Sequence, residues 1–96
     1  MNLKRNLFTA CAIAVAGLAS AQTNFRDITF DQAIEAAQKE NKLVFVDFYT
    51  DWCGPCKMLA RDVFPQKELG DYMNGKFVSV KLNAEKEGKE LARSYK

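Results

Sequence analysis

The chain has 96 residues, with 14 lysines and arginines against 12 aspartates and glutamates, and it contains no histidine. A chain of this length forms one small domain. The near balance of charge excludes the basic surface that nucleic-acid-binding proteins use. The lack of histidine removes the usual general base and the commonest metal ligand, so any catalysis must depend on other side chains.

Residues 1–21 are predicted to be an export signal that is cleaved from the mature protein. Lys4 and Arg5 precede an apolar stretch over residues 7–18, and small residues at positions 19–21 fit the cleavage pattern before Gln22. A membrane anchor is the alternative, but about 12 apolar residues fall short of the roughly 20 that a membrane-spanning helix needs. Cys11 is expected to leave with the signal.

The first part of the mature chain is predicted to be a helix followed by a buried strand. After a short lead-in over residues 22–27, Thr29 and Gln32 have the spacing of an N-terminal capping box. Apolar residues then recur with the helical period at positions 30, 33, 34 and 37. Residues 43–49 form an apolar run interrupted only by Asp47, which is typical of a strand buried on both faces of a parallel sheet.

Helices and a second strand are predicted in the rest of the chain. A helix from about residue 53 or 54 must be interrupted at Pro65. Its inward side is expected to consist of Met58, Leu59, Val63 and Phe64. Further helices are expected over residues 68–74 and 87–95. Residues 77–82 alternate between apolar and other side chains, which predicts a strand with Val78, Val80 and Leu82 on one face. A helical connection of this length makes the two strands parallel.

The most informative feature is the pair Cys53 and Cys56, which lies at the start of a predicted helix directly after a strand. The thiolate is the attacking species in disulfide exchange, and the unpaired amides at a helix N-terminus favour that anion. A second thiol on the same helical face can attack a mixed disulfide and release the partner. A disulfide between the two closes too small a loop to stabilise the fold much, so redox chemistry is favoured over a structural role.

The run Trp52-Cys53-Gly54-Pro55-Cys56-Lys57, after a strand that carries an acid, resembles the active site of the thioredoxin superfamily. The resemblance follows the order of elements from about residue 25 to residue 95. It implies an α/β, thioredoxin-like fold and a thiol–disulfide oxidoreductase that needs no cofactor and no metal. In this family the first cysteine, here Cys53, is the exposed nucleophile, and the second, here Cys56, is the buried resolving thiol.

The resemblance also implies roles for residues around the pair. Trp52 would shape the surface that meets the partner protein, and Gly54-Pro55 is the dipeptide of the reducing members of the family. The residues between the cysteines tune the reduction potential, since they alter how well the thiolate is stabilised. Lys57 either adds positive charge near the thiolate or is an ordinary solvated lysine.

Asp47 and Lys81 are the remaining candidate site residues. By resemblance, Asp47 is the buried acid behind the second cysteine, and Lys81 is the lysine that pairs with it. Independently of the family, an acid inside an apolar strand has a raised pKa unless it is paired, and such a carboxyl can take and return the proton of Cys56. The alternatives are that Asp47 points to a wet edge of the sheet or simply pairs with Lys81.

Two departures from the family pattern affect the expected fold. The segment after Cys56 lacks the proline that kinks the active-site helix of classical thioredoxins, and it resembles the exported branch that includes domains of disulfide-interchange proteins. The chain also ends where the family continues into a β-hairpin, a loop with a cis-proline and a final helix. We therefore expect residues 22–96 to be the N-terminal portion of a thioredoxin-like domain, with an incomplete β-α-β-α core.

The expected substrates are disulfide-containing exported proteins, and the expected electron source is a membrane or periplasmic thiol donor. The need for a nearby donor favours the periplasm, with secretion as the alternative. The protein is expected to be a monomer that binds no nucleic acid. Two other functions stay open. A dimer could hold a metal ion or an iron–sulfur cluster with its two CxxC pairs, or the scaffold could serve as a non-enzymatic binding module.

Overall fold

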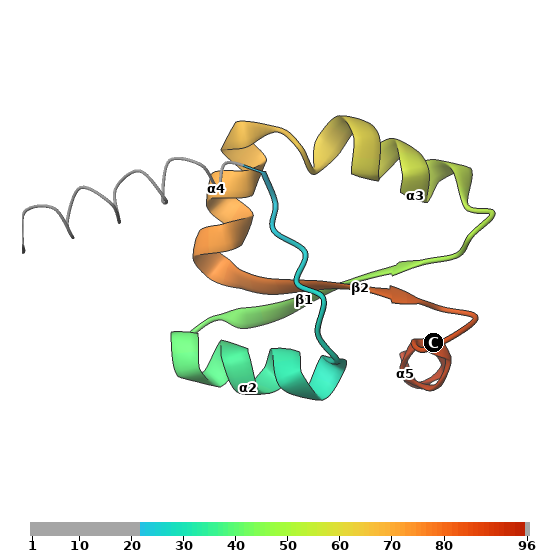
Figure 1. The fold of residues 1–96 in the computed structure, drawn as a ribbon, viewed down its shortest axis with the longest axis horizontal. Coiled ribbons are helices and arrows are strands. Elements are labelled where there is room, and N and C mark those ends of the chain that lie inside the picture. The colour runs from blue at the N-terminus through green and yellow to red at the C-terminus, as the bar shows by residue number, and fades with distance from the viewer. Residues whose placement is uncertain (1–21, 96) are drawn as a thin grey trace, which may run out of the picture.

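The computed structural model describes residues 22–95, so the predicted export signal lies outside the described residues. None of the helices in this range is long and apolar enough to cross a membrane. In chain order the elements are helix α2 (Phe30–Glu40), strand β1 (Leu43–Tyr49), helix α3 (Gly54–Met58), the π-helical turn η1 (Leu59–Val63), helix α4 (Lys67–Lys76), strand β2 (Phe77–Asn83) and helix α5 (Lys89–Ser94) (Figure 1).

Strands β1 and β2 pair in parallel, as predicted, in a register that sets Leu43 beside Phe77 and Tyr49 beside Asn83. Figure 1 shows α2 on one side of this sheet and α3 and α4 on the other. The predicted lead-in runs along the second edge of β2. There Phe25 forms a single parallel bridge with Ser79, and the Arg26 N–H donates to the Ser79 carbonyl at 2.9 Å. Within the described residues, β2 is therefore the central strand.

Strand β2 is also the more deeply buried of the two, which differs from the sequence expectation for residues 43–49. Val78 and Val80 have no exposed surface, whereas Leu43 is 69% exposed and the rest of β1 is only half-buried. The reason is topological. Among residues 22–95, β2 has neighbours along both edges, and β1 pairs along one edge.

The core lies between the sheet and α2. Val78, Val80 and Leu82 project from one face of β2, as their alternation predicted, and pack against Ala33 and Ala37 of α2. The small alanine side chains allow the helix to approach the sheet closely. Half-buried apolar side chains surround this cluster: Ile28, Phe30, Ala36, Val44, Val46, Phe48 and Leu91.

Helix α2 begins where the sequence predicted. The Thr29 hydroxyl accepts from the Gln32 N–H at 3.1 Å, and the Gln32 side chain accepts from the Thr29 N–H at 2.9 Å. At the other end Asn41 adopts the left-handed conformation (φ 56°), and its N–H donates to the Ala37 carbonyl, a common way to end a helix. Ile34, predicted to face inwards, is 36% exposed because the contact stripe is centred on Ala33 and Ala37.

Aromatic rings fill the opposite face of the sheet. Phe25, Phe45 and Phe64 contact one another with ring centroids 4.9 to 6.3 Å apart. Phe77 of β2 lies 6.1 Å from Phe45, and Tyr72 of α4 lies 6.3 Å from Phe77. This aromatic face joins the lead-in, both strands, the end of η1 and α4.

The helical segment after the cysteines departs from the expected pattern. Helix α3 passes into the π-helical turn η1, and the chain turns at Phe64 and Pro65 before α4 begins. Met58 and Leu59 are 56% and 41% exposed, so the prediction that they face inwards is wrong. They lie off the half-buried stripe, which consists of Cys56, Ala60, Val63 and Phe64.

Helix α5 begins at Lys89 because residues 84–88 form a tight turn. The N–H groups of Lys86 and Gly88 both donate to the Asn83 carbonyl, at 3.0 and 2.8 Å. A Cβ atom at Gly88 would lie only 2.8 Å from the Leu82 Cβ, so this close approach requires glycine. Helix α4, in turn, extends to Lys76, beyond the end predicted at residues 74–75.

The burial difference between the strands leads to a test by mutation. Val80→Ala is expected to lower the free energy of unfolding by about 2–3 kcal/mol, since it removes buried methyl groups and leaves a cavity. Val46→Ala, at the paired position in β1, is expected to cost roughly half as much because Val46 is already half-exposed. Urea denaturation followed by circular dichroism measures both values. A larger loss for Val46→Ala would show that β1 is the central strand after all.

Candidate functional site

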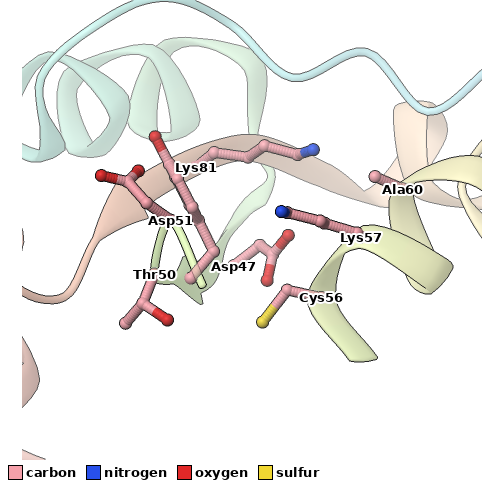
Figure 2. Close-up of a pocket in the computed structure, with 8 residues that line it drawn as sticks. Asp47, Thr50, Asp51, Cys56, Lys57, Ala60 and Lys81 are labelled. Atoms are coloured by element: carbon pink, nitrogen blue, oxygen red, sulfur yellow. The ribbon is translucent and has the colours of Figure 1, made fainter. Parts of the chain in front are cut away.

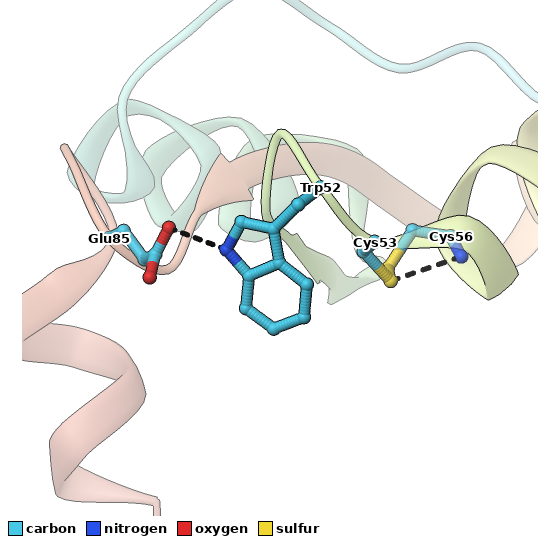
Figure 3. The surroundings of a disulfide bond; sticks show 4 residues. All are labelled: Trp52, Cys53, Cys56 and Glu85. Carbon is cyan, nitrogen blue, oxygen red and sulfur yellow. Dashed lines mark hydrogen bonds between the residues drawn. A yellow bond between two sulfur atoms is a disulfide. The ribbon is translucent and has the colours of Figure 1, made fainter.

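The cysteine pair lies at the carboxyl edge of the sheet, just beyond the end of β1. Cys53 is the N-terminal cap of α3, and Cys56 lies in the first turn of that helix. Their sulfur atoms form a disulfide, with the two Cα atoms 5.3 Å apart (Figure 3). The Cys56 N–H also donates to the Cys53 sulfur at 3.2 Å. Once the disulfide is reduced, the same amide favours the thiolate form of Cys53.

The two residues between the cysteines face solvent. Pro55 lies in the first helical turn, where its missing N–H leaves no helical bond unmade. A Cβ atom at Gly54 would meet no other atom within 4 Å. Cys53 and Cys56 are both half-buried in the disulfide form, whereas the resemblance implied an exposed first cysteine and a buried second one. The open approach to the disulfide therefore lies over Gly54 and Pro55.

A cavity of about 380 Å³ opens beside Cys56 and contains Asp47 (Figure 2). The structure thus brings Asp47, Cys56, Lys57 and Lys81 together around one space. Figure 2 shows the Asp47 carboxylate directed towards the side where Cys56 and Lys57 lie. The other lining residues are Tyr49, Thr50, Asp51 and Ala60.

Burial raises the pKa of Asp47, and the positive charge of Lys81 opposes that rise. The two residues are register partners on β1 and β2. Among the ion pairs of residues 22–95, none joins these two side chains. Lys81 instead holds its ammonium group 4.9 Å from the centroid of the Phe25 ring. Asp47 is therefore a half-buried acid at the rim of the aromatic face, with Lys81 acting on it at longer range.

Trp52 is 74% exposed beside Cys53, and its orientation is set by a contact across the site. Its indole Nε1–H donates to the Glu85 carboxylate at 3.0 Å (Figure 3). Glu85 belongs to the turn that follows β2, so this bond joins the loop after β1 to the turn after β2. The large exposed ring is thereby held next to the disulfide.

Two more contacts join the loop after β1 to the end of β2 and its turn, and the sequence did not predict them. The Asn83 side-chain amide donates to the Asp51 carboxylate at 3.0 Å, and Lys86 forms an ion pair with Asp51 at 3.0 Å. Together with the bond between Trp52 and Glu85, they fasten the loop before Cys53 to the turn after β2. The parallel pairing of the strands was the signal that could have found them, because it brings the segments after both strands to one edge.

Within residues 22–95, no group of three or more histidine, cysteine, aspartate or glutamate side chains is placed to hold a metal ion. The metal-binding alternative would therefore need ligands from a second chain. The chemistry that one chain offers here is that of a dithiol beside a carboxyl of raised pKa.

Comparison with known proteins extends this description. The sequence model of a family described as thioredoxin-like matches residues 24–96. The chain is 44% identical to Thioredoxin 1 of Chlorobaculum tepidum, a match that covers 52% of this chain and 46% of that protein. It is 41% identical to Thioredoxin-1 of Saccharomyces cerevisiae, over 67% of this chain and 74% of that protein.

A solved structure shows the same likeness. The solution structure of a candidate disulphide-isomerase from Bacteroides thetaiotaomicron superimposes with a TM-score of 0.68 at 43% identity, covering 79% of this chain and 64% of that one. The chain thus spans about half the length of the Chlorobaculum protein and under two thirds of this structural neighbour. The family match includes both strands and both cysteines, and it confirms the predicted α/β class. The chain belongs to the thioredoxin-like family.

Proposed function

We propose that this protein is a thiol–disulfide oxidoreductase that reduces disulfides in other proteins through Cys53 and Cys56. The observation that carries the proposal is the disulfide at the N-terminus of α3, in which the Cys56 N–H donates to the Cys53 sulfur. A pair that forms and breaks this bond exchanges two electrons with a partner. Membership of the thioredoxin-like family supports this reading.

The reaction starts from the reduced pair. The Cys53 thiolate attacks one sulfur of the substrate disulfide, whose S–S bond breaks and whose other sulfur leaves as a thiolate. A mixed disulfide now joins Cys53 to the substrate. Cys56 loses its proton and attacks the Cys53 sulfur, which releases the second substrate sulfur as a thiolate. The substrate has gained two electrons and, after protonation, two thiols, while Cys53 and Cys56 have become the disulfide of the structure.

Asp47 is the proposed acceptor for the proton that Cys56 must lose. Both residues line the cavity of Figure 2, and burial raises the pKa of the Asp47 carboxyl. A base of raised pKa accepts a proton from a thiol more readily than an ordinary carboxylate does. Lys81, at the same cavity, opposes this rise in the pKa of Asp47. Lys57 also lines the cavity, where it adds positive charge near the pair.

The exposed surface around the pair is the proposed contact with the substrate. Trp52, held by Glu85, lies on one side of Cys53, and Gly54 and Pro55 leave the approach open. Disulfide-containing exported proteins are the proposed substrates, and a membrane or periplasmic thiol donor is proposed to reduce the pair again. The signal-like pattern of residues 1–21 supports an exported protein, and the need for a nearby electron donor favours the periplasm. We propose that the protein acts there as a monomer.

The roles of the two cysteines can be separated by substitution. Cys53→Ser is expected to abolish catalysis of insulin reduction in an assay that uses dithiothreitol as the electron source. The reason is that serine does not attack a disulfide at neutral pH. Cys56→Ser is expected to attack but not to resolve, so it should accumulate a covalent complex with the substrate. Turbidity measures the first effect, and non-reducing gel electrophoresis detects the second.

Met58→Ala serves as the control, because Met58 is exposed on the same helical segment and should leave activity unchanged. Full activity of Cys53→Ser would contradict the proposed enzyme and would favour a non-enzymatic binding module. A trapped complex with Cys53→Ser but not with Cys56→Ser would reverse the two roles.

Removal of the Asp47 carboxyl should slow the second step. Asp47→Asn is expected to lower the rate at which the mixed disulfide is resolved at pH 7 by about ten- to a hundredfold. This loss is near the lower limit for general-base catalysis, because water also reaches the cavity and can accept the proton. Rapid-quench alkylation of a preformed mixed disulfide measures this rate. The loss should shrink at higher pH, where hydroxide deprotonates Cys56 without help. An unchanged rate at pH 7 would exclude Asp47 as the base.

The same substitution should stabilise the fold. The raised pKa means that the folded state holds the Asp47 proton more tightly than the unfolded state does, so stability falls as pH rises from about 3.8 through the folded pKa. At pH 7, Asp47→Asn is expected to gain less than about 1.4 kcal/mol, since the half-exposed carboxyl is partly screened by solvent. Below about pH 4 the gain should shrink.

Urea denaturation at pH 7 and pH 3.5 measures whether Asp47→Asn raises the free energy of unfolding, and at which pH. Lys81→Met supplies the control, because loss of the attractive charge should destabilise the parent protein more at pH 7 than it destabilises the Asp47→Asn variant. A destabilised Asp47→Asn variant at pH 7 would mean that the carboxylate makes a favourable contact.

A further inference from the structure

Asn83 ends β2 and lies at the centre of the contacts that hold the loop before Cys53. The residue is 2% exposed. Its Nδ2–H donates to Asp51 at 3.0 Å, and its Oδ1 accepts from the Glu85 N–H at 2.9 Å. The amide therefore has one end on the cysteine loop and the other on the turn after β2.

The backbone of Asn83 is fixed as firmly as its side chain. Its N–H donates to the Glu87 carboxylate at 2.7 Å, and its carbonyl accepts from Lys86 and Gly88. The adjacent Ala84 N–H donates to the carbonyl of Tyr49, the last residue of β1, at 2.8 Å. Asn83 thus cannot shift without breaking the turn, and its side chain presents a rigid donor to Asp51.

The other two contacts of the loop are weaker anchors. The ion pair between Lys86 and Asp51 is about two thirds exposed on both sides, and such pairs contribute little. The Trp52 ring that bonds to Glu85 is 74% exposed. The bond from Asn83 ends on the same exposed Asp51 carboxylate, but its loss leaves a buried amide donor without that partner, which costs more than the loss of an exposed pair. Among the loop contacts, the bond from Asn83 to Asp51 is the one that a buried side chain provides.

We propose that Asn83 is a positioning residue that sets the reduction potential of the Cys53–Cys56 pair by holding Asp51; this inference rests on the proposed redox function. Asp51 lies two residues before Cys53. When the disulfide is reduced, the covalent link between Cys53 and Cys56 is lost, and the hydrogen bond to Asp51 keeps the loop in place. The reduced pair therefore remains arranged for closure.

The direction of the effect follows from the conformational entropy of the reduced loop. Without the bond, the reduced loop gains freedom that closure of the disulfide must remove again. The equilibrium constant for forming the disulfide falls, and the potential becomes less negative. A change of tenfold in that constant corresponds to about 30 mV for this two-electron couple. Loss of the bond would make the protein a weaker reductant.

Asn83→Asp is the most direct variant. It keeps the shape of the side chain and the acceptor for the Glu85 N–H, but it places an acceptor against the Asp51 carboxylate where the donor was. The equilibrium constant for disulfide formation is expected to fall about tenfold, or about 30 mV. Thiol alkylation across a series of glutathione buffers measures it without any protein substrate.

The double variant Asn83→Asp, Asp51→Asn provides the rescue. It exchanges donor and acceptor between the two positions, so the hydrogen bond can form again in the opposite sense, with the net charge of the parent protein. Its equilibrium constant for disulfide formation is expected to return to within twofold of the parent value. A potential that stays shifted in the double variant would overturn the proposal.

If Asn83→Asp does not fold, two single variants at Asp51 provide the test, because the Asp51 side chain is largely exposed. Asp51→Asn keeps an oxygen acceptor for Asn83, whereas Asp51→Ala removes it, and both remove the same charge. Only Asp51→Ala is expected to shift the potential. Equal potentials for these two variants would overturn the proposal.

Thr29→Ala is the matched stability control, because it breaks the cap of α2 far from the cysteines. It should lower stability without a change in potential, so a potential that followed stability in general would contradict a specific role of Asn83. A parent protein whose cysteines show no reversible titration would instead overturn the proposed redox function. The two failures are therefore distinguishable.

Discussion

Backbone pairing between β1 and β2 sets Asp47 beside Lys81 and Tyr49 beside Asn83. Side chains on a strand alternate between the two faces with a period of two residues, so a slip of one residue would move every side chain of β1 to the opposite face. Asp47 would then enter the alanine-lined core against α2. The correct register instead puts the acid on the aromatic face, next to Cys56, and brings the ends of both strands together where the cysteine loop begins. The site is therefore a direct product of strand pairing.

The position of Asp47 at the rim of the aromatic face, beside the cavity, explains why an acid is tolerated in this strand. Phe25 and Phe45 lie at the middle of the sheet, and Asp47 follows towards the carboxyl edge, where the cavity opens. The carboxyl is close enough to this apolar surface to lose part of its hydration, which raises its pKa, yet it stays in contact with the cavity. A completely buried Asp47 carboxylate would need a charged or hydrogen-bonding partner. A completely exposed one would keep the ordinary pKa of an aspartate. The stability lost through this partial burial is a cost that the packing between α2 and β2 offsets.

Local patterns predicted the parts of the fold that depend on local physics. The capping box at Thr29, the alternation from Val78 to Leu82 and the CxxC pair needed only neighbours in sequence. The central place of β2 depends on the bridge from Phe25 to Ser79, for which no short-range pattern exists. The exposure of Met58 could not be predicted, because the π-helical turn that follows α3 has no clear residue signature. The bond between Asn83 and Asp51 spans 32 residues and appears only once the strands are paired. The sequence therefore pointed to the candidate cysteine pair, and only the structure located the residues that contact the loop before it.

The order in which the chain is synthesised gives the parallel topology a temporal consequence. Cys53 and Cys56 leave the ribosome well before β2, which supplies Lys81 and Asn83. Parallel pairing closes a long loop and is slow compared with helix formation. For that interval the two thiols are present in a chain that lacks the strand opposite Asp47 and the anchor of Asp51. Helix α3 can already form around them, but the surroundings of the folded site are complete only when β2 docks. The surroundings of the two thiols therefore change during folding even though the cysteines and their helix are local to one segment.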